Sequence, residues 1–143
     1  MPSDPTIPVH FNFGEAGDGR NLIRYASGDS ERLMLTEVGP DLYRLEESSF
    51  AGDAVYGDII RADRSANGDL IFHGIVERSP LVTQSWILSA DVLTSEHIRR
   101  LLSTVTDAGG MWEQAFGGLL MIHAPENIAK AIFDEIGSLK GPP

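Results

Sequence analysis

The chain has 143 residues, which is enough for one domain or two very small ones. Hydrophobic residues make up 42% of it and charged residues 22%, a composition that excludes a disordered tail. The absence of cysteine excludes disulfides, thiolate metal sites and cysteine nucleophiles. The net charge of -10 repels phosphate backbones, so we expect no nucleic-acid partner.

The first eight residues, MPSDPTIP, contain three prolines and no positive side chain, so we expect no signal peptide. No stretch approaches the roughly 18 consecutive apolar residues of a membrane-spanning helix. We therefore expect a cytoplasmic protein with no membrane partner, present as a monomer or a dimer.

Residues 1–80 carry strand and turn signals. Val9, Phe11 and Phe13 alternate with polar residues at the period of a strand. Further strand-like runs cover 32–38, 42–47, 56–64 and 70–78, with turns at Gly39-Pro40-Asp41 and Asn67-Gly68. This half is predicted to form a small antiparallel β module, either barrel-like or a curled sheet.

Residues 81–143 mix strands and helices. The sequence predicts a strand over 83–90 with Trp86, Leu88 and Ala90 on one face, and a helix capped by Thr94 or Ser95. A hairpin over 111–123 and a helix opened by Pro125 complete the order βαββα.

This order matches most of a ferredoxin-like split βαβ unit, but residues 81–143 supply no fourth strand. We expect the β module to supply that strand, so the two halves should form one cooperative unit. The predicted fold class is α+β.

Several motifs resemble one family. LYRLE at 42–46, then Phe50 and YGDII at 56–60, resemble the "YRVxNxPF…GDVV" core of bacterial domain-of-unknown-function family 4265. VERS at 76–79 resembles its "VVxRSG", and the stretch 109–125 resembles its closing "LGCxxE…AVxVP". The likeness covers about residues 9–136.

The chain departs from the family pattern at three positions. Ser49, Pro80 and Gly110 stand where the family has proline, glycine and, frequently, cysteine. The family has no agreed activity, so the resemblance implies a bacterial origin and a compact unit but no mechanism.

The four histidines show no metal-binding spacing, because no two of them lie within ten residues of each other. We expect no metal and no cofactor. His73, in mid-strand, should pack against its neighbours or pair with a carboxylate. His123, at a strand end, should cap or pair, with a functional role as the alternative.

Acidic residues concentrate between Glu37 and Asp58, where six of them stand against the single basic residue Arg44. On alternating strands Tyr43 and Leu45 should point to the core and Arg44 and Glu46 to solvent. The face is predicted to dock a cationic protein, although a merely solubilising edge is the alternative. Its predicted partner-binding residues are Glu46, Glu47, Asp53, Tyr56 and Asp58.

The leading hypothesis is a non-enzymatic acidic protein-binding module of the inhibitor or toxin-immunity type. One alternative is a ferredoxin-like sensor of a small ligand. Another is a hydrolase in which Glu46 or Glu47 works with Asp53 or Asp58 as paired carboxylates.

Overall fold

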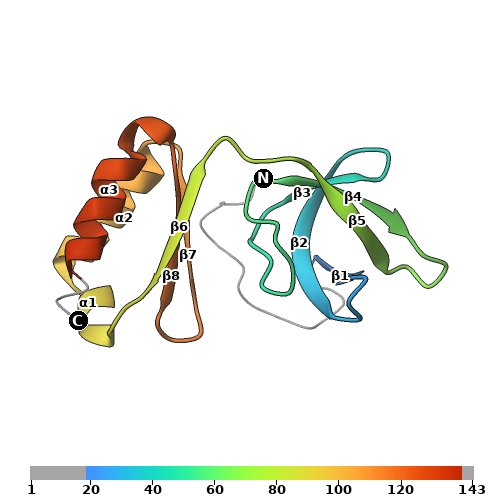
Figure 1. Cartoon of the computed structure of the whole chain (residues 1–143), viewed down its shortest axis with the longest axis horizontal. Coiled ribbons are helices and arrows are strands. Elements are labelled where there is room, and N and C mark those ends of the chain that lie inside the picture. Colours follow the sequence, from blue (N-terminus) through green and yellow to red (C-terminus); the bar gives the residue numbers. More distant parts are fainter. Residues whose placement is uncertain (1–18, 140–143) are drawn as a thin grey trace. The chain divides into compact units, whose positions relative to one another are not determined.

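The computed structural model describes residues 19–139 (Figure 1). The chain divides between Arg78 and Ser79 into two compact units, and each unit has its own hydrophobic core. Strands and helices are both present, which confirms the α+β class. None of the helices described is long and apolar enough to cross a bilayer. The predicted strand around Val9–Phe13 lies outside the described residues.

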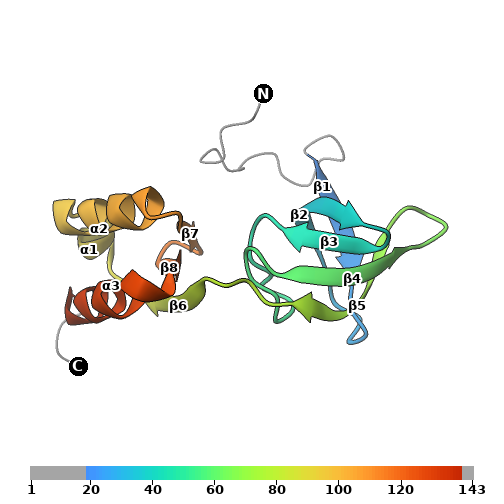
Figure 2. The ribbon, with the colours of Figure 1, turned by 90° about the horizontal axis from the view of Figure 1, so that it is seen from above.

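The first unit is a closed barrel of five strands in chain order (Figure 2). Its strands are β1 (Arg20–Arg24), β2 (Ser30–Gly39), β3 (Leu42–Leu45), β4 (Ile59–Arg64) and β5 (Leu70–Glu77). Consecutive strands are antiparallel, and β1 closes the barrel against β5 in parallel. An odd number of alternating strands requires one parallel pair at closure. The prediction of a barrel-like module is confirmed.

Alternation along β3 places its side chains as predicted. Tyr43 and Leu45 are buried, whereas Arg44 is exposed. The predicted turns also form: Asp41 and Gly68 both have positive φ, of 60° and 95°. The barrel core consists of Ile23, Leu33, Tyr43, Leu45, Ala54, Ile60, Ala62 and Leu70.

The second unit is a three-stranded antiparallel sheet with helices on one side (Figures 1 and 2). Its elements are β6 (Val82–Ile87), α1 (Ala90–Leu93), α2 (Glu96–Asp107), β7 (Met111–Ala115), β8 (Leu119–Ala124) and α3 (Glu126–Leu139). The strand order is β6-β8-β7, so β6 and β7 run in the same direction with β8 between them. This is a split β-α-β arrangement.

Local signals explain most of these helices. The Ser95 side chain caps α2 by accepting a hydrogen bond from Ile98 N. Ala90 was expected to continue a strand, but it begins α1, because Ser89 acts as an N-cap and accepts from Val92 N. Helix α3 follows Pro125 as predicted and passes through Gly137 to Leu139.

Among the described residues, the prediction that the β module supplies a fourth strand to this sheet is wrong. Strands β1 to β5 all belong to the barrel, whose closure pairs both of its edges. No barrel strand therefore has an edge to share, and within residues 19–139 the second sheet keeps three strands.

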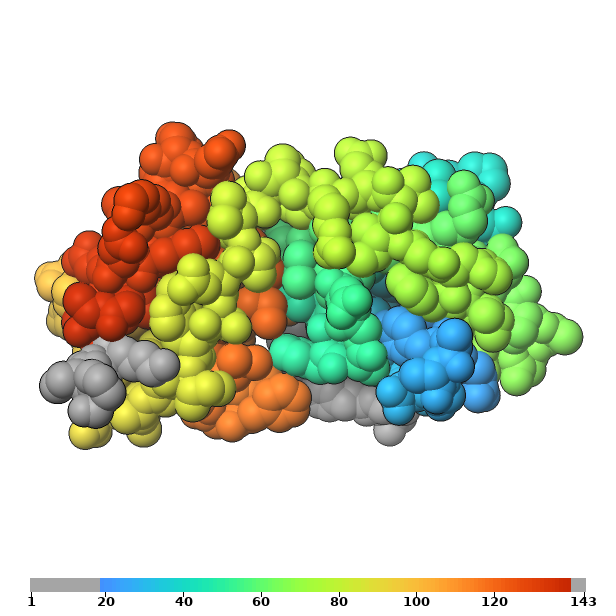
Figure 3. All heavy atoms as spheres, viewed as in Figure 1, coloured from blue at the N-terminus to red at the C-terminus, as the bar shows by residue number. Residues whose placement is uncertain are grey.

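The hairpin between β7 and β8 turns through Phe116 and Gly117, with φ of 53° and 78°. Two successive positive φ values give the twist that a tight hairpin needs. The hairpin, orange in Figure 3, lies at the surface, and Phe116 is 80% exposed.

Gly110 lies where the end of α2 approaches β8 most closely. A Cβ at this position would come 2.4 Å from the His123 carbonyl oxygen and 2.8 Å from Val105 Cγ1. Gly110→Ala should therefore destabilise the protein by about 2–3 kcal/mol, because the backbone has to move. Urea unfolding followed by circular dichroism checks this, with Gly137→Ala as the control, since nothing lies within 4 Å of a Cβ there. Equal stability of the two variants would contradict the packing described.

Candidate functional site

The predicted docking residues lie mainly in the long connection between β3 and β4, residues 46–58. Backbone hydrogen bonds close its base: Leu45 N donates to the Asp58 carbonyl and Gly57 N donates to the Leu45 carbonyl, both at 2.9 Å. Within the connection, Ser49 N donates to the Ala54 carbonyl at 3.0 Å. Loops of this length without regular structure are commonly functional, so its contacts decide what it presents.

Glu31, on β2, holds the middle of this connection. Its carboxylate accepts hydrogen bonds from Phe50 N at 3.1 Å and Ala51 N at 3.3 Å. The Ser49 hydroxyl and the Tyr25 hydroxyl donate to its other oxygen, the latter at 2.5 Å. Burial raises the pKa of the Tyr25 phenol, and the hydrogen bond to Glu31 raises it further, so the phenol keeps its proton.

Asp58 is buried, which corrects its prediction as a surface docking residue. Its side chain is 1% exposed and accepts from Val55 N at 2.9 Å and from Arg78 Nη1 at 3.1 Å. Arg78 also donates to the Asp53 carbonyl at 3.3 Å. The carboxylate of Asp58 therefore organises the end of the connection instead of facing a partner.

The adjacent Glu46 and Glu47 each engage an arginine. Glu47 forms a two-point ion pair with Arg20, at 2.8 and 2.9 Å, and also accepts from Met34 N. Glu46 accepts from Arg44 Nη2 at 2.9 Å and from Thr36 Oγ1 at 2.6 Å. Both glutamates of the hydrolase alternative are therefore held by basic partners.

The other two predicted residues differ in exposure. Asp53 is exposed, and its carboxylate has no ion-pair partner in the described part of the chain. Tyr56 is half-buried, and its backbone N–H donates to the Ser48 hydroxyl at 2.9 Å. Phe50, which is 49% exposed, is a more exposed aromatic of this connection and was not among the predicted partner-binding residues.

A surplus of negative charge remains on both units after these pairs are formed. Among residues 19–139, nine exposed carboxylates form no ion pair with a basic side chain. They are Asp29, Glu37, Asp41, Asp53, Glu77, Asp91, Glu96, Asp107 and Glu126.

A hydroxyl–imidazole–carboxylate chain crosses the three strands of the second sheet. His123 is fully buried; its Nδ1 lies 2.7 Å from Thr83 Oγ1 and its Nε2 lies 2.6 Å from Glu113 Oε2. A carboxylate only accepts, so in the neutral ring Nε2 donates to Glu113 and Nδ1 accepts from Thr83. Thr83 lies on β6, His123 on β8 and Glu113 on β7, so these hydrogen bonds connect the three strands. None of the three residues lines either of the surface grooves described below.

The other two histidines within residues 19–139 also pair with carboxylates. His73 Nε2 lies 2.7 Å from Asp63 Oδ2, which confirms the predicted pairing. His97 Nε2 lies 2.5 Å from Glu135 Oε2 and joins α2 to α3. Within the described ranges, no group of three or more potential ligands is arranged to hold a metal ion.

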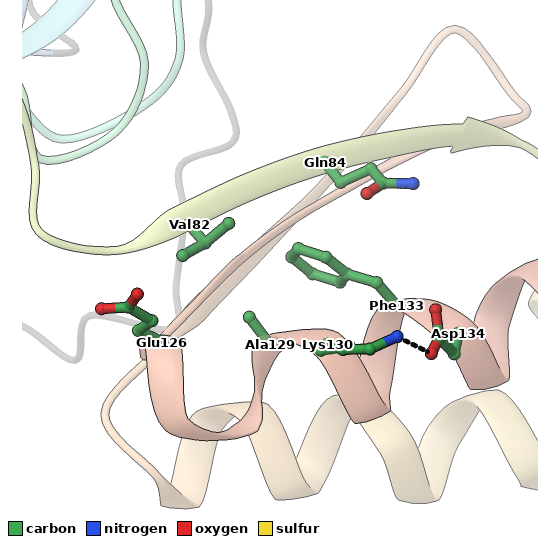
Figure 4. A pocket seen from close by; sticks show the side chains of 7 residues that line it. All are labelled: Val82, Gln84, Glu126, Ala129, Lys130, Phe133 and Asp134. Atoms are coloured by element: carbon green, nitrogen blue, oxygen red, sulfur yellow. Dashed lines mark hydrogen bonds and ion pairs between the residues drawn. The ribbon is translucent and has the colours of Figure 1, made fainter.

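Two open grooves flank the second sheet. One, of about 360 Å³, lies between β6 and α3 (Figure 4). Figure 4 shows Val82 and Gln84 directed toward α3 and Phe133 directed toward the strand. The groove is lined by Val82, Gln84, Glu126, Ala129, Lys130, Phe133 and Asp134. The second groove lies between β7 and α2 and includes Arg99, Trp112 and Gln114.

A crystal structure of a hypothetical protein from Neisseria gonorrhoeae is similar to this chain, with a TM-score of 0.56 and 16% identity over 90% of each chain. At this identity the likeness shows the fold alone. No family model matches the chain, and no match was found among curated proteins. Membership of family 4265 therefore stays a prediction.

Replacing Asp58 separates a structural role from a docking role. Asp58→Ala removes the acceptor of Val55 N and the partner of Arg78, and should lower the free energy of unfolding by about 2 kcal/mol. Asp58→Asn should cost less, because its amide oxygen still accepts from Val55 N. Urea unfolding measures both, and an unchanged free energy for Asp58→Ala would show that the carboxylate is not structural.

Tyr25→Phe should remove about 1 kcal/mol of stability near neutral pH, because the donor to Glu31 is lost. The pKa of Tyr25 is higher in the folded state than in the unfolded chain, so at high pH the unfolded chain loses this proton first. Loss of the proton from the unfolded chain favours unfolding of the native protein but not of the variant. The advantage of the native protein over the variant should therefore shrink as the pH rises above about 10. Paired urea titrations at pH 8 and 10.5 measure this difference; a constant difference would contradict the assignment.

Proposed function

We propose that this protein is a non-enzymatic, acidic module that binds a cationic protein. The observation that supports it best is the surplus of exposed carboxylates without basic partners, which remains after the internal ion pairs are counted. Such a surface attracts a basic partner over distances of about a Debye length, some 8 Å at physiological ionic strength. Attraction of this kind accelerates association and rejects acidic competitors.

Within the predicted docking face, the charge is carried by fewer residues than the sequence suggests. Glu37, Asp41 and Asp53 are exposed and lack ion-pair partners. Asp58 is buried, and Glu46 and Glu47 are engaged by arginines. We assign steering of the partner to the first three.

The most concrete form of this proposal is an inhibitor of a basic enzyme acting on nucleic acid in the cytoplasm. Such enzymes carry positive clefts that hold phosphate, and an acidic protein can cover such a cleft. Membership of family 4265 is compatible with this role but supplies no activity.

The combined variant Glu37→Lys, Asp41→Asn and Asp53→Lys tests the proposal. Asparagine is chosen at 41 because it tolerates the positive φ found there. Basic proteins captured from a lysate of the encoding organism should associate more slowly with the variant, by about tenfold at low salt, and this gap should narrow as salt is added.

The matched control carries the same change of charge at exposed positions elsewhere, in Glu77→Lys, Asp91→Asn and Asp107→Lys. It should slow association less than the barrel variant. Equal capture by the native protein and the barrel variant at every salt concentration, with both folded, would falsify the proposal.

A further inference from the structure

Within residues 19–139, the outer edge of β6 pairs with no other strand. In the sheet order β6-β8-β7, β6 pairs only with β8, through an unbroken register from Val82↔Ala124 to Ile87↔Leu119. In an antiparallel ladder alternate residues turn their N–H and C=O groups away from the neighbour, so these groups of β6 face outward. Among the described residues, none contributes a second hydrogen-bonded strand to this edge.

The sequence of β6, VTQSWI, contains no feature that normally protects an edge. Proteins block free edges with lysine, proline, other charges or bulges, and β6 has none of these. The other edge strand of the sheet, β7, carries Glu113 at its centre. Of these two edges, β6 is the better template for strand addition.

The groove beside this edge fits side chains of an added strand. Phe133, Ala129 and Val82 give it an apolar floor and wall, and α3 lies alongside β6 (Figure 4). Side chains of an extended segment alternate between the two faces of a sheet. Every second residue of a strand added to β6 would therefore point toward α3.

The charges of the groove indicate which segment fits. Glu126 lies at its Val82 end and has no ion-pair partner among the described residues. Asp134 lies toward its Gln84 end and pairs with Lys130 at 2.8 Å, but the Lys130 and Asp134 side chains are 87% and 68% exposed, so this pair is weak and Asp134 can accept a second basic side chain. Along a helix these two carboxylates are separated by about 12 Å. A strand rises about 3.3 Å per residue, so basic residues about four positions apart would lie near both.

We propose that β6 and α3 bind an extended cationic segment of a partner protein by strand addition, with the pattern basic–x–apolar–x–basic. The central apolar side chain packs against Phe133, and the basic side chains lie near Glu126 and Asp134. A second copy of this chain is a poorer occupant, because each copy carries a net charge of -10 and would bring like carboxylates together. The inference rests on the proposed function and names the site at which the attracted partner binds.

The test uses the full-length, nitrogen-15-labelled chain and the capped peptide TKTLTKT as the probe. Amide signals of residues 82–87 should shift on titration, and alternate β6 amides should exchange more slowly with solvent. The peptides TETLTET and TKTSTKT should bind at least threefold more weakly, because one loses charge complementarity and the other loses the apolar side chain. Absence of shifts at β6 with millimolar TKTLTKT would overturn the proposal.

Substitutions at two positions, Gln84 on β6 and Gln114 on β7, give a matched comparison. Gln84→Lys places a positive charge in the groove and should weaken TKTLTKT binding by about threefold. This factor corresponds to the repulsion in water between the new lysine and a peptide lysine about 7 Å away. Gln84→Glu should strengthen binding by a similar factor. Gln114→Lys, the same change beside β7, should leave binding unchanged, and dispersed amide signals confirm that each variant is folded.

The outcomes also separate this inference from the proposed function. If Gln84→Lys and Gln114→Lys behave alike, or if the shifts map to β7 or to the barrel, the β6 site is wrong. Capture of basic proteins that still depends on Glu37, Asp41 and Asp53 would then leave the proposed function standing. Growth of a dimer signal in place of peptide binding would identify a second copy as the occupant and overturn the cationic-segment proposal.

Discussion

Closing a barrel from five consecutive strands uses up every edge that the barrel has, and this constraint decides where backbone remains available for pairing. The closing β1–β5 pair is short, with Ile23 opposite Leu70 and Arg24 opposite Ile71. Ile23 and Leu70 are fully buried, and Arg24 also binds Asp69 across the same junction at 2.8 Å. Side-chain packing therefore supports a closure that only a few backbone bonds maintain. Among the described strands, the only unpaired edges are therefore β6 and β7 of the second sheet.

Carboxylates serve two different purposes in this protein. Glu31 and Asp58 accept backbone N–H groups of the 46–58 connection and replace the ladder bonds that this connection lacks. Glu47 does the same for Met34 N while it holds Arg20. These three carboxylates are hydrogen-bonded within the protein and are not available to bind a partner. The negative charge that attracts another molecule comes from exposed carboxylates such as those of Asp53 and Glu126, which have no ion-pair partner among the described residues.

Periodicity and capping predicted most of the elements, because those signals lie within a few residues of one another. The cap at Ser95 and the alternation that buries Tyr43 and Leu45 are examples. Strand β1 was missed because its sequence, RNLIR, shows no alternation of apolar and polar residues. The burial of Asp58 was also missed, because its partner Arg78 lies twenty positions away and only the fold brings them together. The groove between β6 and α3 likewise depends on strand order, which local sequence does not encode.

The uncharged edge of β6 and the large net charge of the chain belong together. Other proteins place a lysine on an exposed strand, but β6 has no charged residue, so repulsion between copies that each carry a net charge of -10 opposes their pairing. That protection lasts only while the carboxylates are ionised, and it vanishes as the pH approaches the isoelectric point near 4.6. If β6 accepts an added strand as proposed, we expect the chain to pair with copies of itself near that pH.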